Sequence, residues 1–235
     1  PEEPKNGFNQ PGSLTAAVGV GLVFHRHRIK LTEINRLGAE AVALTHGSPL
    51  AFLPGAIIAY LLGRVLRKPE IPLQTLIEES MEAFDDQFGR EYAQAGEILA
   101  LMKQAIAMSR DWKVRPVEAM EKLKCETGAQ VLAGAIYASL VGQDDFDTAM
   151  IAAVNHSGRS AAVGAITGAI LGARMGEAAL PEFYLESLEY LEPLRELADE
   201  LAVKAGVVTF SSHPDSLVSG QTPGLINTLE DRDRL

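Results

Sequence analysis

Few of the side chains that commonly perform chemistry stand at a productive spacing in this sequence. His25 and His27 are two residues apart, which on a helix turns them to different faces, so we interpret them as a solvated basic helix end and not a metal pair. Asp144 and Asp145 are adjacent acids that also point apart, and Asp144 stands where a helix N-cap belongs. Cys125 has no His or Cys at ligand spacing, so we expect a buried free thiol. These residues alone predict no activity.

The elements that position these residues are predicted to be helices. Apolar residues recur at three-to-four spacing after Thr32, which we expect to cap a helix, and Ser48-Pro49 has the cap and first-turn proline of the next one. Strand alternation with hairpin dipeptides is missing throughout. The fold class is therefore predicted as all-α, a single compact domain of eight to ten helices. Further helical segments are predicted over residues 72–84, 92–108, 116–123, 129–141 and 144–154.

Two apolar segments need a specific interpretation. Residues 49–63 (PLAFLPGAIIAYLLG) are too few for a comfortable bilayer span and are interrupted by Pro54, so we expect a buried helix and no membrane insertion. In residues 158–175, Gly164, Gly168 and Gly172 share one helix face. Because each glycine costs about 1 kcal/mol inside a helix, we expect another backbone to pack closely against this face and the helix to be central.

Composition limits the class of function. The chain has 235 residues, 47% of them apolar, which is enough for a sizeable core, and its formal charge of −10 disfavours non-specific binding to nucleic acid. A single cysteine fits a reducing compartment, and the N-terminus lacks the pattern of a secretory signal, so we expect a cytoplasmic protein. The sequence does not begin with Met, which suggests a fragment or a processed product.

Two stretches carry a family resemblance. They are residues 44–51 (LTHGSPLA) and 153–181 (AVNHSGRSAAVGAITGAILGARMGEAALP). Together they resemble the ADP-ribosylglycohydrolase family, which includes ADP-ribosylarginine hydrolases and dinitrogenase reductase-activating glycohydrolases. Residues 125–156 also resemble the helix pair that leads into the family's late loop, and the likeness spans roughly residues 7–201. The matching positions of the late stretch are Asn155, His156, Gly158, Ser160, Gly164, Ala165, Gly168, Gly172 and Pro181.

The resemblance implies an all-helical fold and an activity. Members of this family use two Mg²⁺ or Mn²⁺ ions to bind ADP-ribose and to cleave its bond to arginine, serine or another acceptor. The resemblance places the metal ligands in an N-terminal Thr-Asp-Asp and in an Asp-x-Asp-Thr of the late loop. Oxygen ligands of this kind suit such hard cations.

The chain departs from the family at these ligands. Arg159, Ala161 and Ala162 stand where the family has Asp, Asp and Thr, and the Thr-Asp-Asp is not found in this sequence. Arginine is always protonated and accepts no hydrogen bond, so it cannot bind a cation. We therefore expect no metal and no other cofactor from this sequence.

The predicted substrate-binding residues belong to three segments. The glycine-rich stretch NGFNQPGSLTAA resembles the family's substrate loop, although Leu14-Thr15 replaces its Met-Arg pair. His46 matches a family histidine near bound ADP-ribose, but it could equally serve only to shape the interhelical turn. The full predicted set is Gly7, Phe8, Asn9, Gly12, His46, Asn155, Gly158, Arg159 and Ser160.

Three functional hypotheses follow. The preferred one is a catalytically silent ADP-ribosylglycohydrolase-like protein (a pseudoenzyme) that binds an ADP-ribose-like ligand or a protein partner, with Arg159 supplying positive charge to a phosphate. The second is an active ADP-ribosyl hydrolase whose metal ligands lie outside this chain. The third is a structural or homo-oligomeric protein with no ligand. Residues 1–205 are predicted to form the helical domain, lacking the N-terminal part of the family fold, and residues 206–235 an irregular tail.

Overall fold

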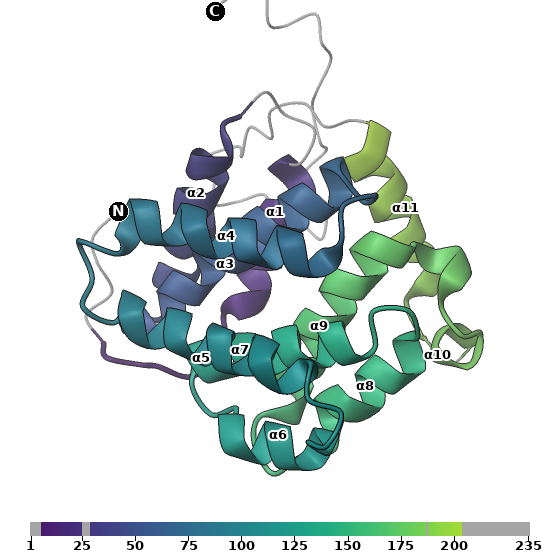
Figure 1. Cartoon of the computed structure of the whole chain (residues 1–235). Helices are drawn as coiled ribbons and strands as arrows, with labels where there is room; N and C mark the ends of the chain where they lie inside the picture. The colour runs from purple at the N-terminus through teal and green to yellow at the C-terminus, as the bar shows by residue number, and fades with distance from the viewer. Residues whose placement is uncertain (1–5, 25–28, 187, 204–235) are drawn as a thin grey trace, which may run out of the picture. The chain divides into compact units, whose positions relative to one another are not determined.

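The computed structural model describes residues 6–24, 29–186 and 188–203. Within these ranges the regular structure is helical and contains no strand, which confirms the all-α prediction (Figure 1). The chain divides into two compact units, Pro1–Leu188 and Glu189–Leu235. His25, His27 and the predicted tail over 206–235 lie outside the described residues, and so does the predicted boundary at residue 205.

The first unit contains ten α-helices and one 3-10 helix among its described residues. The second unit contains the amphipathic helix α11 (Leu191–Val203). The elements of the first unit are α1 (Leu14–Phe24), α2 (Leu31–Ala43), α3 (Pro49–Arg67), α4 (Leu73–Phe88), α5 (Ala95–Ser109), α6 (Pro116–Leu123), α7 (Gly128–Val141), α8 (Phe146–Val154), α9 (Ser160–Met175), η1 (Glu177–Ala179) and α10 (Phe183–Glu186).

Helix α3 is the core helix of the first unit. It contacts α1, α2, α4, α7 and α9. It is long and apolar enough to cross a membrane, but 72% of its apolar window is buried against these neighbours, as in the core helix of a globular domain. The expected interruption at Pro54 was wrong, because the helix runs through it without a break. Pro54 only removes the hydrogen bond that the Leu50 carbonyl would otherwise accept.

The backbones of α2 and α3 approach each other closely, whereas the sequence analysis predicted such an approach at the glycines of α9. A Cβ on Gly38 would collide with the Gly55 carbonyl oxygen, and one on Gly55 would come within 2.6 Å of the Gly38 carbonyl oxygen. On α9, by contrast, Gly164 faces the side chains of Val154 and Met150, whereas a Cβ on Gly168 or Gly172 would have nothing within 4 Å. The prediction of a tightly packed glycine face on α9 was therefore wrong for these two residues.

Two predicted helix caps also differ. Thr32 lies inside α2, whose N-cap is Lys30 with no side-chain cap, so the helix begins two residues earlier than a Thr32 cap would allow. Asp145, and not Asp144, caps α8 by accepting a hydrogen bond from the Asp147 N–H. In both helices the N-cap is the residue with an extended backbone, and this geometry, set by the fold, outweighed the capping preference of the side chain.

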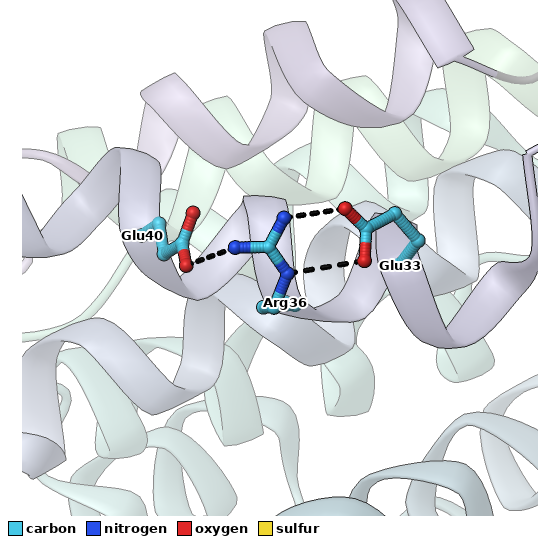
Figure 2. A network of polar contacts seen from close by, with 3 residues as sticks. All are labelled: Glu33, Arg36 and Glu40. Atoms are coloured by element: carbon cyan, nitrogen blue, oxygen red, sulfur yellow. Dashed lines mark hydrogen bonds and ion pairs between the residues drawn. The ribbon is translucent and has the colours of Figure 1, made fainter.

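The solvent face of α2 carries a small ionic network. Figure 2 shows Arg36 between Glu33 and Glu40, one turn away on either side. The hydrogen bond to Arg36 holds the pKa of Glu33 below its usual value, and both carboxylates raise the pKa of Arg36. All three side chains are largely exposed, so the network adds little to stability and keeps this face polar.

Candidate functional site

The N-terminal loop (residues 6–13) is fastened to the turn between α2 and α3 by Asn6. The Asn6 side-chain amide donates to the Thr45 carbonyl (3.0 Å). Its Oδ1 accepts from the N–H groups of Phe8 (3.1 Å) and Gly47 (3.0 Å). One side chain thus joins two segments about forty positions apart in the sequence, through both its amide nitrogen and its amide oxygen.

His46 and Phe8 pack where these two segments meet. The rings of Phe8 and His46 meet edge to face with centroids 6.2 Å apart, and Phe8 is 55% exposed. The His46 ring also lies against Gly12, where a Cβ would be 3.6 Å from Nε2. His46 Nδ1 is 2.9 Å from the Thr45 hydroxyl. His46 therefore does shape this junction, which leaves an exposed aromatic face beside it.

The late loop (residues 155–160) is seated on the segment between α6 and α7. Lys124 and Cys125 both have positive φ, 63° and 52°, which is uncommon for residues with side chains. A Cβ on Gly158 would collide with the Lys124 carbonyl and lie 2.9 Å from Cys125 Cβ, and the Arg159 N–H donates to the Cys125 carbonyl (2.9 Å). Glycine is required at position 158 by this close approach.

His156 closes the late loop from within. The Gly158 N–H donates to its Nδ1 (3.1 Å), so Nδ1 carries no proton. Nε2 is therefore protonated and donates to the Ala153 carbonyl (3.0 Å). Asn155 donates to the Ile151 carbonyl at the end of α8 (2.7 Å), and the Ser160 N–H bonds to Gly158 at the start of α9. Both ring nitrogens of His156 are thus used to hold the loop.

Two carboxylates hold the outer side of the late loop. Glu121 accepts from the Ser157 N–H (2.8 Å) and hydroxyl (2.6 Å), and these donors lower the pKa of Glu121. Glu126 accepts from Arg159 Nε (3.1 Å), with both side chains more than half exposed. Arg159, which was predicted to supply positive charge to a phosphate, is paired with Glu126 in this structure.

Each of the two loops is fastened by one backbone hydrogen bond close to the N-terminus of α7. The Gly128 N–H donates to the Asn9 carbonyl (2.9 Å), which fastens the N-terminal loop there, and Cys125 fastens the late loop three residues earlier. The two attachment points are thus at most about 10 Å apart along the chain. A capping box between Thr127 and Gln130 fixes the segment between them.

The residues present do not fit the metal pair that the resemblance implies. At the corresponding late-loop positions a guanidinium (Arg159) and two methyl groups (Ala161, Ala162) offer no oxygen ligand. Nor does the described part of the chain hold a cluster of three or more His, Cys, Asp or Glu side chains that could bind a metal ion.

Comparison with known proteins places the fold. The sequence model of the ADP-ribosylglycohydrolase family matches residues 1–209. The chain belongs to the ADP-ribosylglycohydrolase family. An uncharacterized protein from Archaeoglobus fulgidus is 29% identical over 195 residues, which are 81% of this chain and 57% of that protein.

A solved structure supports the same family fold. It is described as an "ADP-ribosylglycohydrolase-related protein complex" and superposes with a TM-score of 0.60 at 23% identity, covering 85% of this chain and 63% of its own. At this identity the likeness shows the ADP-ribosylglycohydrolase fold alone. The chain thus spans somewhat less than two thirds of the length of both relatives.

Several residues that build the site were not predicted. Asn6 precedes a glycine, the pattern of a side chain that bonds its own turn, and this signal could have found it. The Thr127-x-x-Gln130 pattern is likewise a readable capping box. Glu121 and Glu126 carry no such signal, because only the fold brings them to residues 157 and 159.

Proposed function

We propose that this ADP-ribosylglycohydrolase-fold protein binds an ADP-ribose-like nucleotide without metal-dependent hydrolysis. The observation that carries the proposal is the convergence of the N-terminal and late loops at the start of α7, with a cation in place of carboxylates. The family supplies the ligand class, and the substitutions at residues 159, 161 and 162 remove the oxygen donors on which the family's chemistry depends. A cytoplasmic location belongs to the same proposal.

The N-terminal loop supports nucleotide binding through groups that remain available. Among the described residues, the N–H groups of Gly7 and Gly12 donate to no protein acceptor, and both glycines are exposed. Such N–H groups can bind phosphate oxygens. The exposed ring of Phe8 offers a surface on which a base can stack, since every base has a π-face.

Arg159 supports phosphate binding only in competition with Glu126. A phosphate offers the guanidinium two oxygens and more charge than a carboxylate, so it can displace an exposed ion pair that contributes little by itself. The Ser160 hydroxyl lies next to it at the first turn of α9, where the helix dipole favours an anion. Ligand affinity should therefore rise when Glu126 is removed and fall when Arg159 is removed.

Calorimetric titration with ADP-ribose tests this competition. Arg159→Gln should weaken binding about tenfold, the loss expected for one charge-assisted hydrogen bond, and Glu126→Gln should strengthen it. Arg115→Gln is the matched control, because Arg115 is also exposed and paired with a glutamate, Glu118, on α6. Equal affinity in the wild type and Arg159→Gln would remove Arg159 from the site, and no ADP-ribose binding at all would favour a structural role.

An activity assay tests the catalytic silence separately. The protein is incubated with an ADP-ribosylated arginine peptide and either Mg²⁺ or Mn²⁺, and free ADP-ribose is measured. We expect no metal-dependent release. Turnover that chelation abolishes would show instead an active hydrolase and would overturn the proposal.

A further inference from the structure

The turn between α5 and α6 presents a tryptophan to solvent. Trp112, the single tryptophan of the sequence, is 88% exposed, and Val117 at the start of α6 is 52% exposed. Lys113 Nζ lies 5.7 Å from the Trp112 ring centroid. Tryptophan is one of the residues that contribute most to the affinity of protein–protein contacts, and so large an exposed ring is otherwise unfavourable in water.

This turn is also basic on an acidic protein. Residues 110–115 (RDWKVR) contain three cations and one anion, whereas the whole chain carries a formal charge of −10. Arg110 and Arg115 are paired with Glu78 and Glu118 of the same chain, so Lys113 is the cation of the turn that has no ion pair with a described residue. We call these six residues the Trp112 turn. Its chemistry, an apolar ring flanked by positive charge, calls for a partner surface with an apolar recess and negative charge.

A groove of that chemistry lies between α4 and α5 and has a volume of about 490 Å³. Its apolar lining comes from Met81, Leu99 and Ile106, and its α4 side carries carboxylates. Glu78 pairs with Arg110 (3.4 Å), while Glu82 and Asp85 form no ion pair with any described residue. Lys103 of α5 also lines the groove, so its apolar floor lies beside these two carboxylates and one lysine.

The groove and the Trp112 turn are adjacent on the same unit. Arg110 belongs to both, since it lines one end of the groove and begins the turn. In a twofold dimer each copy must present both complementary surfaces, so that two identical contacts form at once. Because the groove and the Trp112 turn lie on one unit and share Arg110, each copy presents both surfaces.

We propose that the groove between α4 and α5 is a dimerisation site that receives the Trp112 turn of a second copy of this chain. The indole rests on Met81, Leu99 and Ile106, and the cations of the turn, Lys113 foremost, face Glu82 and Asp85. This inference does not depend on the proposed nucleotide site, none of whose residues lines the groove.

The fluorescence of Trp112 tests the proposal in the full chain, because no other tryptophan contributes. Raising the protein concentration should shift the emission to the blue and protect it from acrylamide, in parallel with dimer formation measured by sedimentation velocity. A chain that stays monomeric up to about 1 mM would overturn the proposal. So would a blue-shifted emission independent of concentration, which would mean that the chain covers its own tryptophan.

Charge reversal locates the interface. Lys113→Glu and Glu82→Lys should each raise the dimer dissociation constant about tenfold or more, and the double variant should recover much of the loss. Trp112→Ala should abolish association without unfolding the chain, because the ring contacts so little of its own unit. Glu70→Lys, at an exposed position outside the groove, is the matched control. A dimer that none of these changes affects, or a double variant with no recovery, would place the interface elsewhere.

Discussion

The two loops of the candidate site are fastened in different ways. The N-terminal loop is held by one neutral side chain, Asn6, and by backbone contacts, which leave the N–H groups of Gly7 and Gly12 unused by described residues and the ring of Phe8 exposed. The late loop is held by the very side chains that the motif offers for binding. Both nitrogens of His156 are occupied, and Arg159 is paired with Glu126.

This difference shows which half of the site has groups available for a ligand. Polar groups that already satisfy one another contribute to the shape of a loop, whereas a ligand must compete for them. Under the proposed function, a ligand would bind the N-terminal loop without rearrangement, whereas binding to the late loop would require the exchange of an internal partner. A motif match in the N-terminal loop therefore identifies groups that are available to a ligand, whereas a match in the late loop identifies groups that already bond one another.

The largest effect should come from filling the space beneath the late loop. Gly158→Ala forces a methyl group against the Lys124 carbonyl and Cys125, so we expect a loss of about 2–3 kcal/mol in the free energy of unfolding. Gly168→Ala is the control, because nothing lies within 4 Å of its added methyl group and alanine favours a helix by up to about 1 kcal/mol. Urea denaturation of both variants measures the contrast, and equal stabilities would contradict it.

Removing the attachment of the N-terminal loop should have the next largest effect. Asn6→Ala deletes three hydrogen bonds and leaves the Gly47 N–H without its acceptor, so we expect a loss of about 1–2 kcal/mol. Hydrogen exchange should accelerate at Phe8 and Gly47 and stay unchanged at Gly158. Faster exchange in both loops would show that they are coupled and would contradict independent fastening.

A smaller effect should appear in acid. The Ser157 donors hold the pKa of Glu121 below its usual 4.5, so their stabilising contribution is complete above that pH and is lost as the pH falls through the lowered pKa. Glu121→Gln should therefore be less stable than the wild type at pH 7, and the difference should shrink below about pH 4.5. Thermal unfolding across this range measures it, and a difference constant with pH would argue against the ionised carboxylate.

The smallest effect on stability is expected at the exposed ion pair of the late loop. Glu126→Gln should change the free energy of unfolding by less than about 0.5 kcal/mol, because both partners are more than half exposed. The expected effect of Glu126→Gln is a higher affinity for ADP-ribose. A loss near that of Gly158→Ala would mean that the pair holds the loop in place.

Much of the fold could be predicted from the sequence, because helical periodicity and caps are local. The α6 bounds were predicted as they stand, and the other predicted helices lie at nearly the right places. The apolar run of residues 49–63 predicted the burial of α3, whereas the contact between Gly38 and Gly55 is a tertiary fact that no local pattern encodes. On α9, Gly168 and Gly172 had the pattern of close packing, but nothing lies within 4 Å of a Cβ added to either glycine.

In the candidate site, too, local motifs could be predicted from the sequence and tertiary contacts could not. Motif order identified residues that the fold does bring to the start of α7, although whether they bind a ligand stays a prediction. The partners of those residues could not be predicted, because Glu121 and Glu126 reach the late loop from more than thirty positions away. A guanidinium in a motif signals positive charge, but its own neighbours decide whether that charge is available.

The single thiol of the protein is enclosed where the late loop meets α6 and α7. Gly158 approaches the Cys125 Cβ, while the sulfur lies against Gly134 and 3.9 Å from the Met120 carbonyl oxygen. Cys125 is fully buried, and burial raises its pKa to about 12, so a thiol reagent meets neither an accessible sulfur nor a thiolate at neutral pH. Its rate of alkylation in the native protein therefore reports how often this whole junction opens, and a ligand that bridges the two loops should slow that rate.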